Sequence, residues 1–132
     1  IIKSNVPDGA DPAALPIEFL NADALVLPNG DIQMGVALKA TAKNIGTKPY
    51  LPGGTSLKIK LFQKTGQNWV EVESKSVNIL VAGAETSFNF YTTYIKVKQK
   101  PPTFRLVVES KNAGVPNPDV NMNNNSKEAQ AQ

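Results

Sequence analysis

The sequence predicts an all-β fold, and three observations support this. Ten prolines and nine glycines in 132 residues are many for a helical bundle and suit short strands joined by turns. Stretches of alternating apolar and polar residues recur at intervals of roughly ten residues. No long helical pattern lies between them, which disfavours parallel βαβ folds. We therefore expect roughly seven to nine strands in an antiparallel β-sandwich or barrel.

The chain lacks both cysteine and histidine, which excludes several kinds of chemistry. A disulfide framework, a thiolate metal site and a cysteine nucleophile cannot form. The usual general base near neutral pH is missing as well. The pair Glu71 and Glu73 lies on one open face of a predicted strand, where a glycosidase centre is not expected. We expect no enzyme activity and no cofactor.

The formal net charge of +3 is too small to indicate a nucleic-acid partner. No apolar run reaches the roughly 20 residues of a membrane-spanning helix, so we expect no membrane span. The sequence starts at Ile1, without an initiator methionine or a signal peptide. This start is typical of a processed exported protein, and an excised domain would give the same start.

The expected domain organisation has three parts. Turn and breaker residues without periodicity make residues 1–16 an extended leader or linker. Residues 17–125 carry the alternating patterns and form the β-sandwich domain. Residues 126–132 lack apolar anchors, so we expect a disordered tail.

The first two strands follow from alternation and a turn signal. Apolar residues on either side of a polar step predict a strand with an interruption at 17–27. An Asn-Gly pair within 28–31 supplies the positive φ of a tight turn. Residues 32–43 alternate apolar side chains with Lys and Thr, which is typical of a sheet with one wet side. An amphipathic helix is the alternative for this stretch, and the Asn and Gly of 44–47 favour the strand.

The middle of the chain predicts a hairpin. Two prolines and two glycines make 48–54 a loop. Residues 55–63 show the cleanest alternation in the protein, with lysines on the outer face. A connection of hairpin length containing Gly leads to a strand at 69–75. We expect the valines of that strand to face inward.

The next elements are a short strand, a turn and an aromatic strand. Apolar residues at alternate positions predict a strand at 76–81, and Ala-Gly-Ala-Glu at 82–85 predicts a turn. Residues 86–94 contain Phe88 and Phe90 on one face, which is a strong core signal for a sandwich.

The last part of the chain alternates extended segments with loops. Residues 95–100 are expected to be extended, with three lysines on one side, and a proline pair ends the segment. A strand follows at 103–111, then a loop at 112–118. Residues 119–125 are expected to form a last edge strand with Val120 and Met122 inward.

The order of these elements and their corners resembles the CARDB family, the cell-adhesion-related domain found in bacteria. Over residues 15–126 the chain has an alternating strand that ends in an Asn-x-Gly corner, a turn before a Phe-x-Phe strand, and a closing Asn-Asn pair. The matching residues are Asn44 and Gly46 at the corner, Gly83 and Glu85 at the turn, and Asn123 and Asn124 at the close. The resemblance implies an immunoglobulin-like sandwich and a non-catalytic module of exported or surface proteins.

One motif has the spacing of a calcium loop. Asp119, Asn121 and Asn123 place oxygens at alternate positions, as the first residues of such a loop do. The sixth position is Asn124 instead of glycine, and the twelfth is Gln130 instead of glutamate. We therefore expect no metal here and expect these side chains to cap backbone groups.

Two sets of side chains are candidates for binding. The aromatic residues could stack on sugars or anchor a protein interface, and Trp69 is the first choice because its position in the strand points outward. The lysines could hold an anionic glycan or lipid head group, although lysines also protect edge strands from pairing. The candidates are Trp69, Tyr50, Tyr91 and Tyr94 among the aromatics, and Lys96, Lys98 and Lys100 among the lysines.

The expected function is a non-catalytic adhesion, spacer or protein-assembly module of a secreted, periplasmic or cell-surface bacterial protein. The expected partner is a protein or a glycan at the cell surface. A carbohydrate-binding module that uses the exposed aromatics is the alternative. A third possibility is self-association through an edge strand.

Overall fold

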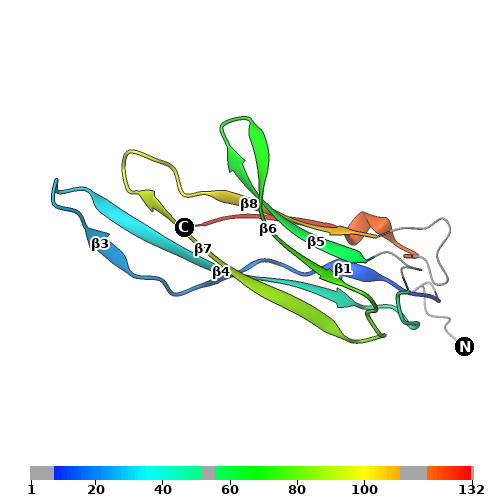
Figure 1. Cartoon of the computed structure of the whole chain (residues 1–132). Coiled ribbons are helices and arrows are strands. Elements are labelled where there is room, and N and C mark those ends of the chain that lie inside the picture. Colours follow the sequence, from blue (N-terminus) through cyan, green and yellow to red (C-terminus); the bar gives the residue numbers. More distant parts are fainter. Residues whose placement is uncertain (1–7, 52–55, 111–118, 132) are drawn as a thin grey trace, which may run out of the picture.

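The structure is a computed structural model that describes residues 8–51, 56–110 and 119–131. Within these ranges nine strands and a short 3-10 helix form two antiparallel sheets (Figure 1). The first sheet contains β1 (Pro12–Ala14), β2 (Glu18–Leu20), β3 (Ala24–Val26), β4 (Ile32–Asn44) and β7 (Glu85–Ile95). The second sheet contains β6 (Asn68–Val77), β5 (Leu57–Thr65), β8 (Thr103–Glu109) and β9 (Ser126–Gln130) in that spatial order, and the helix η1 (Met122–Asn124) precedes β9. The predicted all-β antiparallel sandwich is confirmed.

β4 is the longest strand, and the first sheet is built around it. β7 pairs with β4 over eleven consecutive positions along one edge. The short strands β1, β2 and β3 pair with successive parts of β4 and must therefore share its other edge. The predicted interruption in 17–27 is the gap between β2 and β3, where the Gly35 amide donates to the Asp23 carbonyl. The turn at 28–31 is also confirmed, with Gly30 at a φ of 89°.

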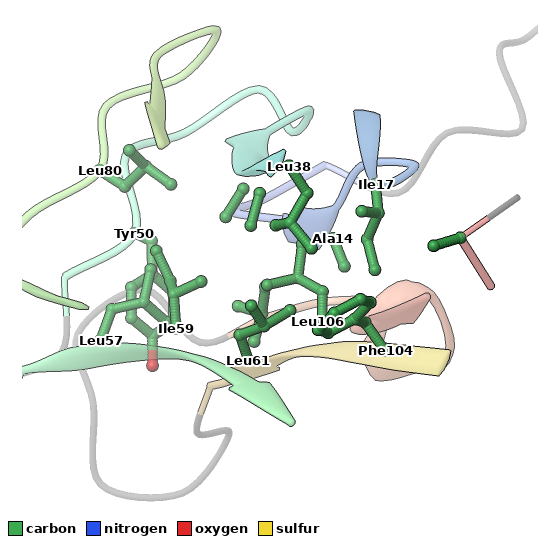
Figure 2. Close-up of a cluster of buried hydrophobic side chains, with 14 of the residues drawn as sticks. Ala14, Ile17, Leu38, Tyr50, Leu57, Ile59, Leu61, Leu80, Phe104 and Leu106 are labelled. Carbon is green, nitrogen blue, oxygen red and sulfur yellow. The ribbon is translucent and has the colours of Figure 1, made fainter. Parts of the chain in front are cut away.

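The core lies between the two sheets and follows the predicted alternation. In β4 every second residue from Val36 to Asn44 is buried, which confirms the strand and excludes the helical alternative. Figure 2 shows side chains of β5 and β8 pointing toward Leu38, Ala14 and Ile17 of the opposite layer. The buried side chains of the second sheet are Leu57, Ile59, Leu61, Phe104, Leu106 and Val108.

Aromatic rings fill the middle of this core. The ring centroids of Phe90 and Phe104 lie 6.0 Å apart in an edge-to-face arrangement, and those of Phe19 and Phe104 lie 6.2 Å apart. Both distances fall in the range that favours aromatic pairs. Phe88 also packs against the core, as its place in the Phe-x-Phe strand predicts.

The expected extended leader is wrong for the residues that the structure describes. Residues 9–14 are buried, and β1 pairs with the end of β4. A proline at the start of a short edge strand does no harm, because it removes a donor that the ladder does not need. The small side chains of Ala13 and Ala14 allow the strand to lie close against the sheet. The sandwich therefore begins well before residue 17.

The expected disordered tail and last edge strand are also wrong. β9 pairs with β8 from Gln130 to Ser126, and Ala129 and Ala131 pack into the core. Two alanines, one in β9 and one directly after it, are a weak apolar signal in the sequence. Residues 122–124 form η1 instead of a strand, and Val120 and Met122 are exposed.

Two further expected segments differ. β6 runs on to Val77, and Leu80 forms an isolated bridge with Tyr50, so that 76–81 is not a separate strand. The segment 95–100 is a turn, since β7 ends at Ile95 and the Gln99 amide donates back to the Ile95 carbonyl. Val97 there has a φ of 76°, in the left-handed region.

The hairpin of β5 and β6 is confirmed, and its tip projects away from the rest of the molecule in Figure 1. Val72 packs against the core as expected, whereas Val70 lies nearer the tip and is exposed. The turn at 82–85 is confirmed, with Gly83 at a φ of 79°. Residues 1–7 of the expected leader, 52–55 of the first loop, the loop 112–118 and Gln132 lie outside the described residues. No helix in the described part of the chain is long and apolar enough to cross a membrane.

Candidate functional site

A buried polar cluster joins the beginning and the end of the chain, and we call it the Asp11–Asp119 cluster. Asp11 precedes β1, while the other members follow β8 or precede β9, and Figure 1 shows η1 beside β1 at one end of the molecule. The amide of Val120 donates to the Ala10 carbonyl over 2.9 Å, which holds the two segments together. The members are Asp11, Ser110, Asp119, Asn124 and Asn125.

The Asp119 carboxylate is the centre of the hydrogen bonds in this cluster. It is 2% exposed. Its Oδ2 accepts from the Ser110 hydroxyl and from Asn125 Nδ2, the latter over 2.8 Å, and its Oδ1 accepts from the Asn121 amide over 3.1 Å.

The Asp11 carboxyl has fewer partners. Its Oδ2 accepts from Asn124 Nδ2 over 3.2 Å, and its own amide donates to Asn44 Oδ1 over 2.9 Å. Burial raises the pKa of Asp11 above its ordinary value, the hydrogen bond from Asn124 opposes that rise, and the charge of Asp119 adds to it. The two carboxyl groups are therefore close enough to oppose each other's charge.

Three buried oxygens of the cluster have no hydrogen-bond partner in the structure. They are Asp11 Oδ1, Asn124 Oδ1 and Asn125 Oδ1. Buried polar atoms in native proteins are nearly always satisfied. Three unsatisfied acceptors in one cluster are therefore exceptional.

The neighbouring corner fixes the position of Asp11. The side chain of Asn44 is fully buried; its Oδ1 accepts from Asp11 and Gly46, and its Nδ2 donates to the carbonyls of Lys48 and Leu80, each over 2.8 Å. Gly46 is required for a different reason, because a Cβ there would lie 2.1 Å from the Gly9 carbonyl oxygen. This corner carries part of the family resemblance, and its residues hold the segment before β1 against the sheet.

Of the predicted calcium-loop residues, only Asp119 enters the cluster. The side chain of Asn121 accepts from the Asn123 amide and caps η1, which is the backbone-capping role expected of these residues. Asn123 is exposed. In the described part of the chain no group of three or more acidic side chains could hold a metal ion.

Trp69 lies on the outer face of the second sheet, and cationic groups cover it. The Arg105 guanidinium carbon lies 4.2 Å from the ring centroid, and Lys64 Nζ lies 5.9 Å from it. Arg105 is in turn held by Glu128 over 3.2 Å. Part of the ring surface that a sugar would need is therefore occupied by Arg105.

The three tyrosines have different environments. Tyr50 is 1% exposed and lies in the core beside Leu57, Ile59 and Leu80 (Figure 2), so the expectation of an exposed binding residue is wrong there. Tyr94 is half-buried and packs against the core. Tyr91 is 60% exposed and is the most accessible of the four aromatic candidates.

The lysines do not form a stripe on a strand. Lys96, Lys98 and Lys100 are exposed around the turn after β7, and Lys98 Nζ binds Asp31 Oδ2 over 2.7 Å. On the outer face of β5, Lys60 binds Glu109 over 3.1 Å and Glu71 over 3.6 Å, and the Glu109 contact raises the pKa of Lys60.

Sequence reasoning missed most members of the Asp11–Asp119 cluster. Asp11 and Asn124 lie 113 positions apart, so no local spacing relates them. Asp11 stands between two breakers in the expected leader, and Asn124 and Asn125 stand in an asparagine run that suggests a solvated end. Only the pairing of β1 with β4 and of β9 with β8 brings these residues together.

The comparison with solved structures supports the fold. No protein-family model matches the sequence, and no curated protein matches it. Among solved structures, the CARDB domain of a Pyrococcus furiosus protein, described as a complex with di-metal ions, superposes with a TM-score of 0.62 at 17% identity. The match covers 96% of this chain and 90% of that one. This chain has a CARDB-like fold. The CARDB-like architecture is an immunoglobulin-like sandwich, as the sequence resemblance implies.

Proposed function

We propose that this CARDB-like chain is a non-catalytic adhesion, spacer or protein-assembly module of an exported or cell-surface protein. The observation that carries the proposal is the fold, which is that of a domain related to cell adhesion. Such a module works by presenting loops and sheet edges on a rigid core. The absence of cysteine and histidine from the sequence supports a role without catalysis.

The proposed location is tested on intact cells of the source organism. Antibodies raised against the domain should label cells before their envelope is made permeable, and a cytoplasmic marker should be labelled only afterwards. Labelling of the domain only in permeable cells contradicts an exported module.

Assembly through sheet edges is the mode that the geometry supports best. Among the described strands, β6 pairs only with β5 and β7 pairs only with β4. Each therefore has a long outer edge along which a strand from a partner or from a second copy could add. Light scattering should then give a mass for the isolated domain that rises with concentration. A monomer mass at all concentrations contradicts edge pairing between copies.

A carbohydrate-binding module is the second candidate, and the position of Tyr91 favours it. The ring stands on the outer face of the first sheet and lines an open depression together with Asp23, Leu25 and Gln33. A Cβ on Gly35 would lie 3.0 Å from the Tyr91 hydroxyl, so the glycine leaves room for the ring to lie over the strand. An exposed ring beside polar side chains is a suitable platform for a sugar.

A glycan array separates the two candidates. If the chain binds sugars, Tyr91→Ala should abolish binding and Tyr91→Phe should keep most of it. Trp69→Ala serves as the comparison, since Arg105 already covers that ring. No glycan binding by the unmodified domain, or binding that survives Tyr91→Ala, excludes this site.

A further inference from the structure

We propose that the Asp11–Asp119 cluster binds a divalent cation, with Ca²⁺ as the ion that suits it best. The groups available are two carboxylates and two asparagine side chains, brought together from both ends of the described chain. The site shares only Asp119 with the calcium-loop spacing in the sequence, because the side chains of Asn121 and Asn123 take no part in it.

The first argument is the burial of unsatisfied oxygens. Asp11 is 5% exposed and Asn125 is 7% exposed, yet each has a side-chain oxygen without a partner. Leaving such acceptors unsatisfied is unfavourable. A cation bound to Asp11 Oδ1 would satisfy the free carboxylate oxygen directly.

The second argument is charge. Two carboxylates are buried near each other, and in the described part of the chain no lysine or arginine forms an ion pair with either. Buried charges in proteins are normally paired or bind metals.

The third argument concerns the asparagines. Asn124 Nδ2 lies 3.2 Å from Asp11 Oδ2, and Asn125 Nδ2 lies 2.8 Å from Asp119 Oδ2. Half a turn of a terminal amide exchanges its nitrogen and oxygen without moving other atoms. With a cation present, each amide would offer its oxygen beside the carboxylates.

The ligand chemistry selects the ion. The cluster offers oxygens only, and the sequence contains no histidine or cysteine, which disfavours zinc and other soft metals. Mg²⁺ demands near-ideal octahedral geometry and keeps several waters, whereas Ca²⁺ accepts irregular coordination by carboxylate and amide oxygens. Two carboxylates and neutral oxygens are typical of weak extracellular sites, with dissociation constants of about 10⁻⁴–10⁻³ M.

The test is a Ca²⁺ titration of the domain after treatment with EDTA. Calorimetry should show one binding event, and the melting temperature should rise by about 4 °C when Ca²⁺ stands at about ten times its dissociation constant. MgCl₂ at the same concentration should give a smaller rise. Backbone amide shifts in NMR should change around Asp11 and along 119–125 and stay constant at the β5–β6 hairpin.

Two Asp→Asn substitutions, each of which removes one negative charge, provide the decisive comparison. Asp11→Asn removes one ligand charge with almost no change in shape, so it should abolish the Ca²⁺-dependent rise in melting temperature. Asp31→Asn makes the same change in a turn outside the cluster and should leave the rise intact. Circular dichroism confirms that each variant is folded. Asp119→Asn is less suitable, because Asp119 accepts three hydrogen bonds and its loss threatens the fold.

The proposal is overturned if the unmodified domain shows no Ca²⁺ binding at millimolar concentration. It is also overturned if Asp11→Asn responds to Ca²⁺ as the unmodified domain does, or if the NMR shifts lie elsewhere. A pair of carboxyl groups that holds a shared proton in place of a cation would give the first result, which is no Ca²⁺ binding. The test is independent of the proposed adhesion or assembly role, since it measures only the isolated domain.

Discussion

Replacement of Asn44 by alanine should be among the most destabilising single changes in this protein. The side chain makes four hydrogen bonds to backbone groups, and it is fully buried. Those bonds join the end of β4 to the segment before β1, to the corner after β4 and to the bridge at Leu80. The alanine side chain has no polar atom, so it could not replace any of these hydrogen bonds.

The magnitude follows from the count of bonds. Each buried hydrogen bond contributes about 1 kcal/mol net, and a partner left unsatisfied in the interior adds to the loss. Two of the four bonds are only partly buried, so water can recover some of their energy. We expect the free energy of unfolding to fall by about 3–4 kcal/mol, which is a large part of the roughly 5–15 kcal/mol of a typical domain.

Urea denaturation measures this loss, with circular dichroism and the fluorescence of Trp69 as two probes. Trp69 is the only tryptophan of the chain, so its signal has one source. The control is Asn29→Ala, because Asn29 also makes two side-chain hydrogen bonds, both exposed and both with Asp31. The control should change the free energy by less than about 0.5 kcal/mol. A loss below about 1.5 kcal/mol for Asn44→Ala would refute the role given to this corner.

Two further predictions concern the same corner and the turn beside β3. Gly46→Ala should lower the free energy of unfolding by about 2–3 kcal/mol, because its Cβ would meet the Gly9 carbonyl oxygen at 2.1 Å, and urea denaturation equal to wild type would contradict this. Asp31 has a lowered pKa because Lys98 donates to it, so its contribution to stability is present above the unfolded-state pKa and is lost as pH falls through the folded-state pKa. NMR titration of Lys98→Ala should show the Asp31 pKa moving up toward its ordinary value, and an unchanged pKa would show that the ion pair has no effect.

The fold was predictable where alternation was long and regular. Buried side chains alternate with more accessible ones from Val36 to Asn44 in β4, from Leu57 to Leu61 in β5 and along β8, and period-two patterns identify such strands directly. The Phe-x-Phe pattern predicted β7 for the same reason. These four strands contain most of the large core side chains, so the sandwich could be predicted before its edges were known.

The ends of the chain were not predictable in the same way. β1 contains a proline and two alanines, and β9 reads Ser-Lys-Glu-Ala-Gln, so neither has an apolar pattern of its own. Each is a strand because a core strand already offers an unpaired edge beside it. Tertiary context of this kind overrides local propensity.

The candidate site could be predicted only in part. Asp119 was found through its spacing with Asn121, but its side-chain partners Ser110 and Asn125 were not, and Asp11 joins the cluster from the other end of the chain. The exposure of Tyr91 followed from its alternation with Phe90, whereas the burial of Tyr50 did not, because a tyrosine between prolines and glycines looks like a loop residue. Within a strand, the alternation of side chains predicts which of them are exposed. A loop has no such alternation, so exposure there cannot be predicted in this way.

The three short strands along one edge of β4 have a consequence for local unfolding. Since β1, β2 and β3 pair with β4 separately, each can detach without breaking the hydrogen bonds of the others. β3 is exposed along its whole length, so its amides should exchange with solvent through small local openings. β1 is buried along its whole length and the Asn44 corner holds the segment before it, so its amides should exchange only when the sandwich opens. One edge of β4 thus carries both a strand whose amides should be well protected and one whose amides should not.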